Sequence, residues 1–164
     1  MCAVPLPVQT PDGIFTAHYS ERGLAALNFP GAGVRSNFTP ANLPTTILQW
    51  HAWTERAVRA VLAGKPITSL PPLDLAAGTA FQRRVWKELR NIPLGETRSY
   101  GKVADAVGVR HAARAVGRAC GANPIPLLIP CHRVLAANRK LGGFSGGPNW
   151  KKRLLKIEGV RVAR

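Results

Sequence analysis

The stretch GETRSYGKVADAVGVRHAARAVGRACGANP, residues 95–124, decides the architecture of the second half of the chain. Ser99 is a good N-cap for a short helix that Gly108 would close. A second helix is predicted over 110–120, where small apolar side chains and arginines fall on separate faces: Ala112, Ala115, Val116 and Ala119, against Arg110, Arg114 and Arg118. Two such helices joined by a glycine-containing turn predict a DNA-binding helix-turn-helix, and a helical hairpin with a solvated arginine face is the alternative.

The positive charge of the chain is concentrated in the same half. The 164 residues carry a formal net charge of +15. Residues 1–79 hold 5 basic and 4 acidic side chains, whereas residues 80–164 hold 18 basic and 4 acidic ones, a net +14. Such a surface attracts a polyanion, and nucleic acid is the commonest one for a cytoplasmic protein. An anionic membrane is a weaker alternative because no basic amphipathic helix stands alone, and a basic but inert surface is the third.

Composition places the chain among globular proteins. Hydrophobic residues make up 46%, enough for a buried core. No apolar run approaches the about 18 to 20 residues of a membrane span, and the start MCAVPLPVQTPDG lacks the regions of a signal peptide, so a cytoplasmic location is predicted. The three cysteines, Cys2, Cys120 and Cys131, fit neither a disulfide framework nor a CxxC metal site. We therefore expect reduced thiols and no structural zinc.

The first half predicts a small α+β scaffold. GIFTAHYS (13–20) and LAALNF (24–29) predict the two strands of a hairpin, followed by an aperiodic loop over 29–44. A helix is predicted over 45–63, with one apolar face: Ile47, Trp50, Thr54, Ala57, Val58 and Val61. ITSLPPLDL (67–75) predicts a third strand at a sheet edge, because its prolines cannot donate to a ladder.

A new helix opens the second half. Thr79 and Gln82 form a capping-box pattern, and an apolar face precedes Pro93: Phe81, Val85, Trp86 and Leu89. We therefore predict an α+β protein in two domains. A sheet-and-helix domain is expected over 1–78, and a mostly helical domain of winged helix-turn-helix type over 79–164.

Cys131 is the first candidate for chemistry. The apolar run IPLLI (125–129) predicts a buried strand that delivers the thiol from a fixed backbone. His132 and Arg133 would favour the reactive thiolate by lowering the thiol pKa. Neighbours in an extended chain point to opposite faces, so His132 can act as a base only if the chain turns or a water bridges the two. The alternative is an inert, buried cysteine.

Two features near the C-terminus accompany the thiol. The hinge GGFSGG (142–147) lets the backbone and the Phe144 ring approach a planar ligand. A helix follows, with Pro148 in its first turn and Gly159 just past its end. Glu158 would oppose the dipole at the end of that helix, so it needs a partner such as a histidine, unless it is simply solvated.

These segments together resemble a known family. IPCHRV, preceded by AARAVG and NPIP and followed by GGFSGG and LLKIEG, closely resembles the O6-alkylguanine-DNA alkyltransferases, also called methylated-DNA–protein-cysteine methyltransferases. The resemblance covers residues 79–159 nearly without gaps, whereas the first 78 residues resemble the family only in their layout. It implies DNA repair by direct reversal, in which the alkyl group of a flipped-out O6-alkylguanine passes irreversibly to the protein's own cysteine.

The resemblance implies a role for each residue around the thiol. Cys131 matches the nucleophile, and His132 matches the base that takes the thiol proton through a water. Glu158 matches the acid that orients that histidine, and Asn123 the residue that holds the cysteine loop. Tyr100 matches a tyrosine beside the base and its 3′ phosphate, whose hydroxyl helps to protonate the leaving guanine.

The family's substrate and DNA contacts also have counterparts. Ser145 and the backbone around Val134 match contacts to the guanine, while Phe144 stands where many relatives have a tyrosine, so its ring contributes only packing. Arg114 matches an arginine finger that enters from the minor groove and replaces the flipped base, and Arg118 and Ser99 are further candidate DNA contacts.

The resemblance also sets expectations about partners. The partner is duplex DNA that carries O6-alkylguanine, with O4-alkylthymine as a further candidate lesion, and the protein is expected to be a monomer that can bind DNA cooperatively. We expect no organic cofactor, and no metal because Cys2 and His18 alone cannot form a site. A lesion-binding protein of alkyltransferase-like type is the alternative, although those proteins replace the cysteine. A Cys-His hydrolase is disfavoured because such dyads bring distant residues together.

Overall fold

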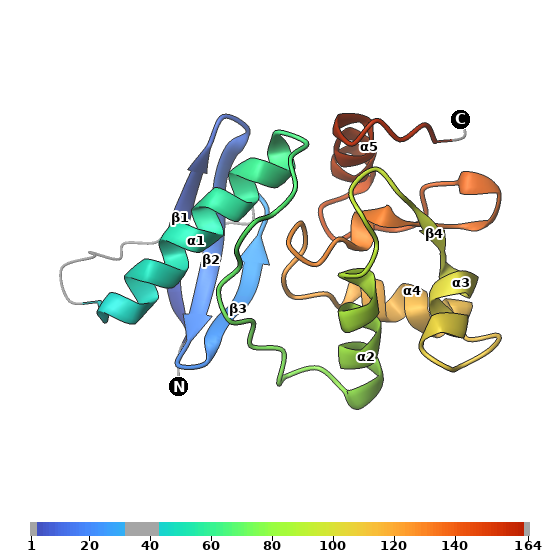
Figure 1. Cartoon of the computed structure of the whole chain (residues 1–164), viewed down its shortest axis with the longest axis horizontal. Helices are drawn as coiled ribbons and strands as arrows, with labels where there is room; N and C mark the ends of the chain where they lie inside the picture. Colours follow the sequence, from blue (N-terminus) through green and yellow to red (C-terminus); the bar gives the residue numbers. More distant parts are fainter. Residues whose placement is uncertain (1–2, 32–42, 163–164) are drawn as a thin grey trace.

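The structure, a computed structural model, describes residues 3–31 and 43–162. Its first half is an antiparallel sheet of order β1-β2-β3, with one long helix lying across it (Figure 1). The bounds are β1 Val4–Thr10, β2 Gly13–Ser20, β3 Gly23–Asn28 and α1 Thr45–Leu62. The predicted hairpin and helix are confirmed. Most of the loop predicted over 29–44 lies outside the described residues.

Strand β1 is an element that the sequence does not predict, because Pro5 and Pro7 interrupt it. Within the part of the chain that the structure describes, the strand lies at the edge of the sheet and pairs only with β2, placing Pro5 opposite His18 and Pro7 opposite Thr16. Residues two apart direct their backbone amides to the same side of a strand. Both prolines can therefore occupy the side that has no neighbouring strand, where a missing donor costs nothing.

The strand predicted over 67–75 is wrong. This segment is a loop that meets the sheet through one isolated parallel bridge, between Leu24 and Leu73. The Leu24 amide donates to the Pro72 carbonyl at 2.8 Å, and the Leu24 carbonyl accepts from the Asp74 amide at 2.8 Å. Pro72 has no amide hydrogen, so the ladder cannot extend along this segment.

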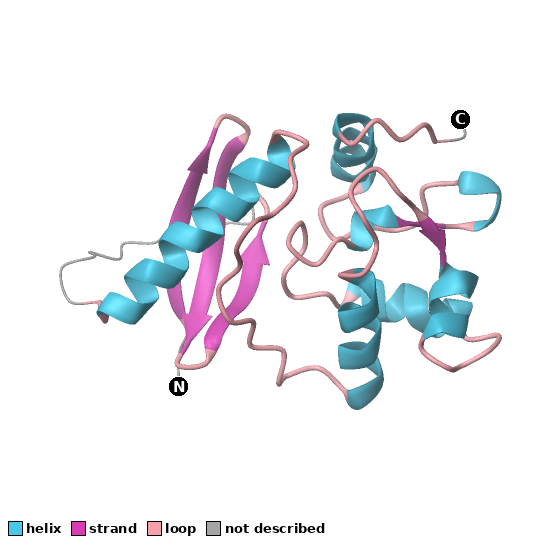
Figure 2. Cartoon of the chain, in the orientation of Figure 1, coloured by secondary structure: helices cyan, strands magenta, loops and turns pink. Residues whose placement is uncertain are grey.

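The second half consists of short helices connected by loops (Figure 2). Its bounds are α2 Ala80–Leu89, β4 Arg98–Ser99, α3 Tyr100–Ala106, α4 Ala113–Gly121, β5 Val134–Leu135 and α5 Pro148–Ile157. The predicted capping box of α2 is present, since the Thr79 amide donates to Gln82 Oε1 at 2.8 Å and the Gln82 amide to Thr79 Oγ1 at 3.2 Å. Strands β4 and β5 form a short parallel pair.

Helices α3 and α4 pack against each other, as the opening stretch predicts. Ser99 caps α3 by accepting the Lys102 amide at 3.2 Å, and Gly108 follows with a φ of 76°. Helix α4 begins later than predicted, at Ala113, because His111 has a φ of 60° that no helix tolerates. The placement of Arg110 on the helical arginine face is therefore wrong.

The buried strand predicted over 125–129 is also wrong. All of its residues are buried, the proline included, but the backbone is a series of turns. The Asn123 side chain accepts the Ile125 amide at 3.0 Å, and the Ile129 amide bonds the Ile125 carbonyl at 2.9 Å. Prolines at 124, 126 and 130 remove the amides that a strand needs, so local side-chain and turn bonds replace the ladder.

The two halves share one hydrophobic core. The Leu27 amide at the end of the sheet donates to the Pro124 carbonyl at 2.9 Å, just before the cysteine segment. Helix α5 packs against α1, and Arg153 on α5 pairs with Asp12 in the β1-β2 turn. The sheet is therefore attached directly to the segments that flank Cys131. Within the described residues, no helix is both long and apolar enough to cross a membrane.

Candidate active site

Cys131 begins a 3-10 turn, Cys131–Arg133, and its side chain lies inside the protein. The residue is only 2% exposed. Asn123, at the end of α4, donates from Nδ2 to the Cys131 sulfur at 3.2 Å and to the Ile129 carbonyl at 2.9 Å. One amide group thus holds both the nucleophilic atom and the backbone that leads to it.

The thiol is protonated in the resting site. Burial raises the pKa of Cys131 to about 11, against the hydrogen bond from Asn123 and the positive charge of Lys151, which both lower it. The prediction that His132 and Arg133 favour the anion is wrong. The Arg133 guanidinium points to Glu158, and burial keeps the imidazole uncharged. Deprotonation must therefore accompany the reaction.

His132 is fully buried and paired with Glu158. Its Nε2 lies 2.8 Å from Glu158 Oε1, across a sequence separation of 26 residues. Burial lowers the pKa of His132, although the Glu158 carboxylate opposes this, so the ring is neutral at pH 7. The chain turns at Cys131–Arg133, so the segment is not extended and the first of the two conditions for His132 to act as a base is met. His132 Nδ1 has no hydrogen-bond partner among the residues that the structure describes.

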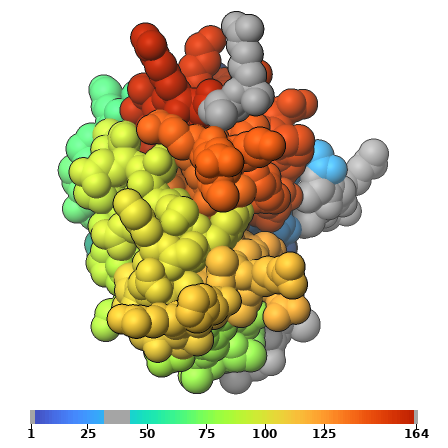
Figure 3. Space-filling model, turned by 90° about the vertical axis from the view of Figure 1, so that its right-hand side faces the viewer, coloured from blue at the N-terminus to red at the C-terminus, as the bar shows by residue number. Residues whose placement is uncertain are grey.

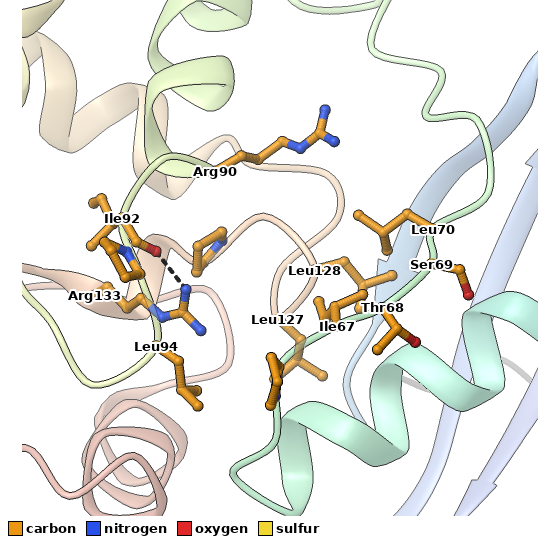
Figure 4. A pocket seen from close by; sticks show the side chains of 13 residues that line it. Ile67, Thr68, Ser69, Leu70, Arg90, Ile92, Leu94, Leu127, Leu128 and Arg133 are labelled. Atoms are coloured by element: carbon orange, nitrogen blue, oxygen red, sulfur yellow. Dashed lines mark hydrogen bonds between the residues drawn. The ribbon is translucent and has the colours of Figure 1, made fainter.

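Arg133 supports the carboxylate from the other side. Its Nε donates to the two Glu158 oxygens at 3.2 and 3.0 Å, and one terminal nitrogen donates to the Ile92 carbonyl at 2.6 Å. Figure 4 shows this arginine bonded to Ile92 at the edge of a pocket of about 510 Å³. Burial acts to raise the pKa of Glu158, but the bonds from His132 and Arg133 outweigh it, and the pKa falls to about 2.

We expect Glu158 to stabilise the fold at neutral pH and to lose this contribution in acid. Its folded-state pKa of about 2 lies below the ordinary 4.5, so the contribution is complete above 4.5 and is lost as the pH falls toward 2. It amounts to about 3 kcal/mol at most. Urea unfolding at several pH values should show Glu158→Gln to be less stable than wild type at neutral pH, and less sensitive to acid.

The exposed Glu96 provides a matched control. Glu96→Gln removes the same charge without touching the pair, so its stability should follow that of wild type at every pH. Parallel curves for wild type and Glu158→Gln between about pH 5 and about pH 2 would contradict the role of the carboxylate.

Six predicted site residues line a single groove of about 940 Å³: Ser99, Tyr100, Arg114, Arg118, Phe144 and Ser145. Both arginines are exposed on α4, while the aromatic rings are half-buried. Figure 3 looks onto this side, where the yellow surface that includes α3 meets the orange loops that follow Cys131. Val134 does not line the groove and is fully buried.

Tyr100 is the first residue of α3, and two glycines leave room for its ring. A Cβ at Gly142 would lie 2.8 Å from the Tyr100 hydroxyl, and the φ of 65° at this position also favours glycine. A Cβ at Gly117 would be in ordinary contact with the ring, at 3.8 Å. Burial raises the pKa of Tyr100 to about 12, so the phenol keeps its proton at neutral pH.

Lys151 belongs to the same site, although the sequence interpretation omits it. Its side chain is 0% exposed. Nζ donates to the Val134 carbonyl at 2.7 Å and to the Gly143 carbonyl at 3.3 Å, and it lies 5.8 Å from the centre of the Tyr100 ring. Helical spacing provides a signal for it, because Lys151 stands three and four residues before the buried Leu154 and Leu155.

An aromatic cluster connects the sheet to the substrate loop. The Phe29 ring, which follows β3, lies 5.6 Å from Phe144 and 5.1 Å from Trp150, centre to centre. Phe144 in turn lies 6.3 Å from the His132 ring. A Cβ at Gly146 would come within 2.7 Å of Phe29, so the hinge glycine permits this approach. Phe144 is therefore fixed by packing, and Phe29 is a contributor from the first half that the sequence interpretation misses.

The prediction that the protein holds no metal names two residues, Cys2 and His18, and the structure describes only the second. Cys2 lies outside the described residues. Among residues 3–31 and 43–162, no group of three or more His, Cys, Asp or Glu side chains could hold a metal ion. His18 instead bonds Asn28 within the sheet, at 3.1 Å.

The chain is similar to known proteins in sequence and in fold. Residues 80–160 match the family model of the 6-O-methylguanine DNA methyltransferase DNA-binding domain. The O6-methylguanine methyltransferase of Mycobacterium tuberculosis superposes with a TM-score of 0.74 at 36% identity, over 99% of this chain and 96% of that one. The chain belongs to the O6-methylguanine-DNA methyltransferase family. The OGT of the same species, solved in complex with DNA, superposes with a TM-score of 0.77 at 41% identity, over 93% and 90% of the two chains.

Curated relatives extend the likeness within the methyltransferase family. The methylated-DNA–protein-cysteine methyltransferase of Mycobacterium bovis is 53% identical over 105 residues, which are 64% of this chain and 63% of that protein. The match thus spans less than two thirds of such relatives. Residues 80–160, which match the DNA-binding domain model, contain all of the site residues predicted from the sequence, from Ser99 to Glu158.

Proposed function

We propose that the protein repairs DNA by direct reversal, moving the alkyl group from O6 of guanine to its own Cys131. One arrangement carries this proposal. The buried Cys131 thiol, bonded by Asn123, lies in the same turn as His132, which is bonded to Glu158. Membership of the methyltransferase family supplies the reaction class. Because the acceptor is a protein side chain, each molecule reacts once and needs no organic cofactor.

The reaction is a displacement at a saturated carbon. The Cys131 sulfur bonds to the alkyl carbon while the bond from that carbon to O6 breaks, and the electron pair leaves with the guanine. The thiol proton passes through water to Nδ1 of His132, whose lowered pKa keeps it able to accept. The Tyr100 hydroxyl protonates the guanine and regains its proton from the histidinium.

The flipped base would enter the groove lined by Tyr100, Phe144 and Ser145. Phe144 offers one face of a packed ring, and Ser145 supplies a hydroxyl for the base edge. The Val134 carbonyl accepts from Lys151 but keeps a second lone pair, which is available for the guanine amino group. Recognition of the guanine therefore combines stacking with a few fixed polar contacts. Thymine alkylated at O4 is a further candidate substrate.

The DNA partner follows from the exposed arginines on the groove. Arg114, Arg118 and Ser99 all line this groove, which supports the proposal. In it, Arg114 enters the duplex and fills the gap left by the flipped base, while Arg118 and Ser99 contact phosphates. The net +14 of residues 80–164 adds sequence-independent attraction to the backbone. Such contacts suit a protein that must find lesions in any sequence, rather than read one operator.

Assembly, location and domains belong to the same proposal. All candidate site residues come from one chain, so a monomer suffices, although neighbouring copies can bind DNA cooperatively.

A cytoplasmic location suits a reaction that needs a reduced thiol, as both described cysteines are free. We place the domain boundary at 78/79, directly before the capped start of α2.

The test is the intact mass of the protein after incubation with a duplex that carries O6-methylguanine. We expect a gain of one methyl group per chain, located on the peptide that contains Cys131, and unmodified guanine in the DNA. An unchanged mass together with tight binding of the methylated duplex would overturn the proposal in favour of the alkyltransferase-like alternative.

A further inference from the structure

Lys151 is a buried cation within the candidate site. It is the fourth residue of α5 and is 0% exposed. Among the described residues it forms no salt bridge, whereas the buried Glu158 is paired with both His132 and Arg133. An ammonium group without a carboxylate partner is expensive to bury, and an apolar side chain of similar size would fill the space at lower cost. Retention of a lysine here therefore calls for a functional reason.

The two carbonyls that Lys151 binds belong to two different segments of the site. Val134 comes directly after the turn that presents Cys131, and Gly143 comes directly before Phe144 and Ser145. Nζ bonds the first at 2.7 Å and the second at 3.3 Å. One ammonium group therefore joins the nucleophile's turn to the loop that lines the base groove.

The charge of this ammonium also acts on the thiol. Three titratable groups on the surrounding helices interact electrostatically with Cys131: Tyr100 on α3, Cys120 on α4 and Lys151 on α5. Tyr100 and Cys120 are both neutral at pH 7, because burial raises the pKa of each to about 12. His132 is neutral and Arg133 is bound to Glu158. Burial lowers the pKa of Lys151, but Cys131 and Cys120 act to raise it, so Lys151 supplies the positive charge beside which a thiolate could form.

We propose that Lys151 is a positioning residue with an electrostatic role: its ammonium holds the Phe144 loop against the Cys131 turn and stabilises the thiolate as it forms. The proposal rests on the alkyl transfer proposed above for its biological meaning. The hydrogen bonds to the two carbonyls require a donor, whereas stabilisation of the thiolate requires a positive charge. Substitutions that remove only one of these properties therefore separate the positioning role from the electrostatic role.

Three substitutions and one control test the proposal. Lys151→Met removes donor and charge at similar size, Lys151→Gln keeps a donor without charge, and Lys151→Arg keeps the charge. The control is Lys152→Met, which changes an exposed lysine on the same helix. Each variant is first compared with wild type by thermal unfolding. Should the methionine variant fail to fold, the glutamine and arginine variants retain the comparison.

The first measurement is the rate of Cys131 alkylation by iodoacetamide against pH, read from fragment ions that distinguish Cys131 from Cys120 on the same peptide. It does not require repair activity. We expect the midpoint of the rate profile to lie about one pH unit higher in the Met and Gln variants than in wild type. At a fixed pH below the midpoint, their alkylation rate should therefore be about tenfold lower. The Arg and Lys152→Met variants should keep the wild-type profile. Unmoved profiles for well-folded Met and Gln variants would overturn the electrostatic role.

The second measurement is transfer from free O6-benzylguanine at saturating and subsaturating concentration. The Met variant should show a several-fold higher half-saturating concentration, while the Gln variant recovers part of the loss. Equal half-saturation in wild type and Met variant would overturn the positioning role. If wild type transfers no benzyl group, the proposed function fails, and the iodoacetamide profile still decides the electrostatic role.

Discussion

Replacing Cys131 with serine should abolish alkyl transfer while leaving lesion binding intact. A serine hydroxyl ionises far less readily than a thiol, and the buried site already raises the pKa of Cys131 to about 11, so an oxygen nucleophile has no route to its anion. Transfer from methylated duplex, followed by intact mass, should fall to the background of DNA alone. Gel-shift affinity for the same duplex should stay within about threefold, less than 1 kcal/mol, because the groove lining is unchanged.

Cys120 supplies the matched control for that result. It is a second free thiol, 5% exposed, on the neighbouring helix α4. Burial raises its pKa to about 12, and no hydrogen bond comparable to that of Asn123 lowers it. Cys120→Ala should therefore transfer at close to the wild-type rate. No lysine or arginine separates Cys120 from Cys131, so fragment-ion sequencing must locate the methyl group. A methyl group on Cys120, or a mass gain in Cys131→Ser, would refute the assignment of the acceptor.

Arg114→Ala should lose about 100-fold in repair of duplex DNA and almost nothing in reaction with free O6-benzylguanine. Unstacking a base costs a few kcal/mol, and a side chain that replaces it in the stack offsets part of that cost, so its removal slows only the reaction that requires flipping. The free base needs no flipping and enters the groove directly. Single-turnover rates with the two substrates provide the measurement.

Arg110 provides the comparison within the same segment. It carries the same charge and is exposed, but it lies in the turn before α4 rather than on the helix. Arg110→Ala should therefore show only the loss of one general electrostatic contact, about tenfold at most. An equal loss in both variants, or an Arg114→Ala loss that is the same for duplex and free base, would contradict the finger assignment.

Much of the fold was accessible from local patterns. Helices α1, α2, α3 and α5 begin and end close to their predicted residues, because periodicity, caps and helix-ending glycines act over a few residues. The errors about strands all involve proline. Pro5 and Pro7 conceal a strand, whereas Pro72 and the prolines around 125–129 belong to segments mistaken for strands. A proline prevents strand pairing only where a neighbouring strand would accept a hydrogen bond from its amide. Local sequence patterns do not show where the neighbouring strand lies.

In the candidate site, too, some features can be predicted from the sequence and others only from the structure. The reactive thiol, the need of Glu158 for a partner and the arginines of α4 are visible as residue types in a pattern. The family resemblance connects them, but it leaves the state of the thiol open. Burial decides that state, since it raises the pKa of Cys131 and lowers that of His132, and burial arises only when distant segments pack together.

The sequence by itself determined the helices, the basic half and the list of reactive groups, because short-range spacing and composition encode them. Only the tertiary structure decided which groups meet. It bonds His132 to Glu158 across 26 residues, aligns Phe29 from the sheet with Phe144, and buries Lys151 between the Val134 and Gly143 carbonyls. These contacts depend on the packing of the sheet half and α5 against the cysteine turn, and such long-range packing leaves no local signature in the chain.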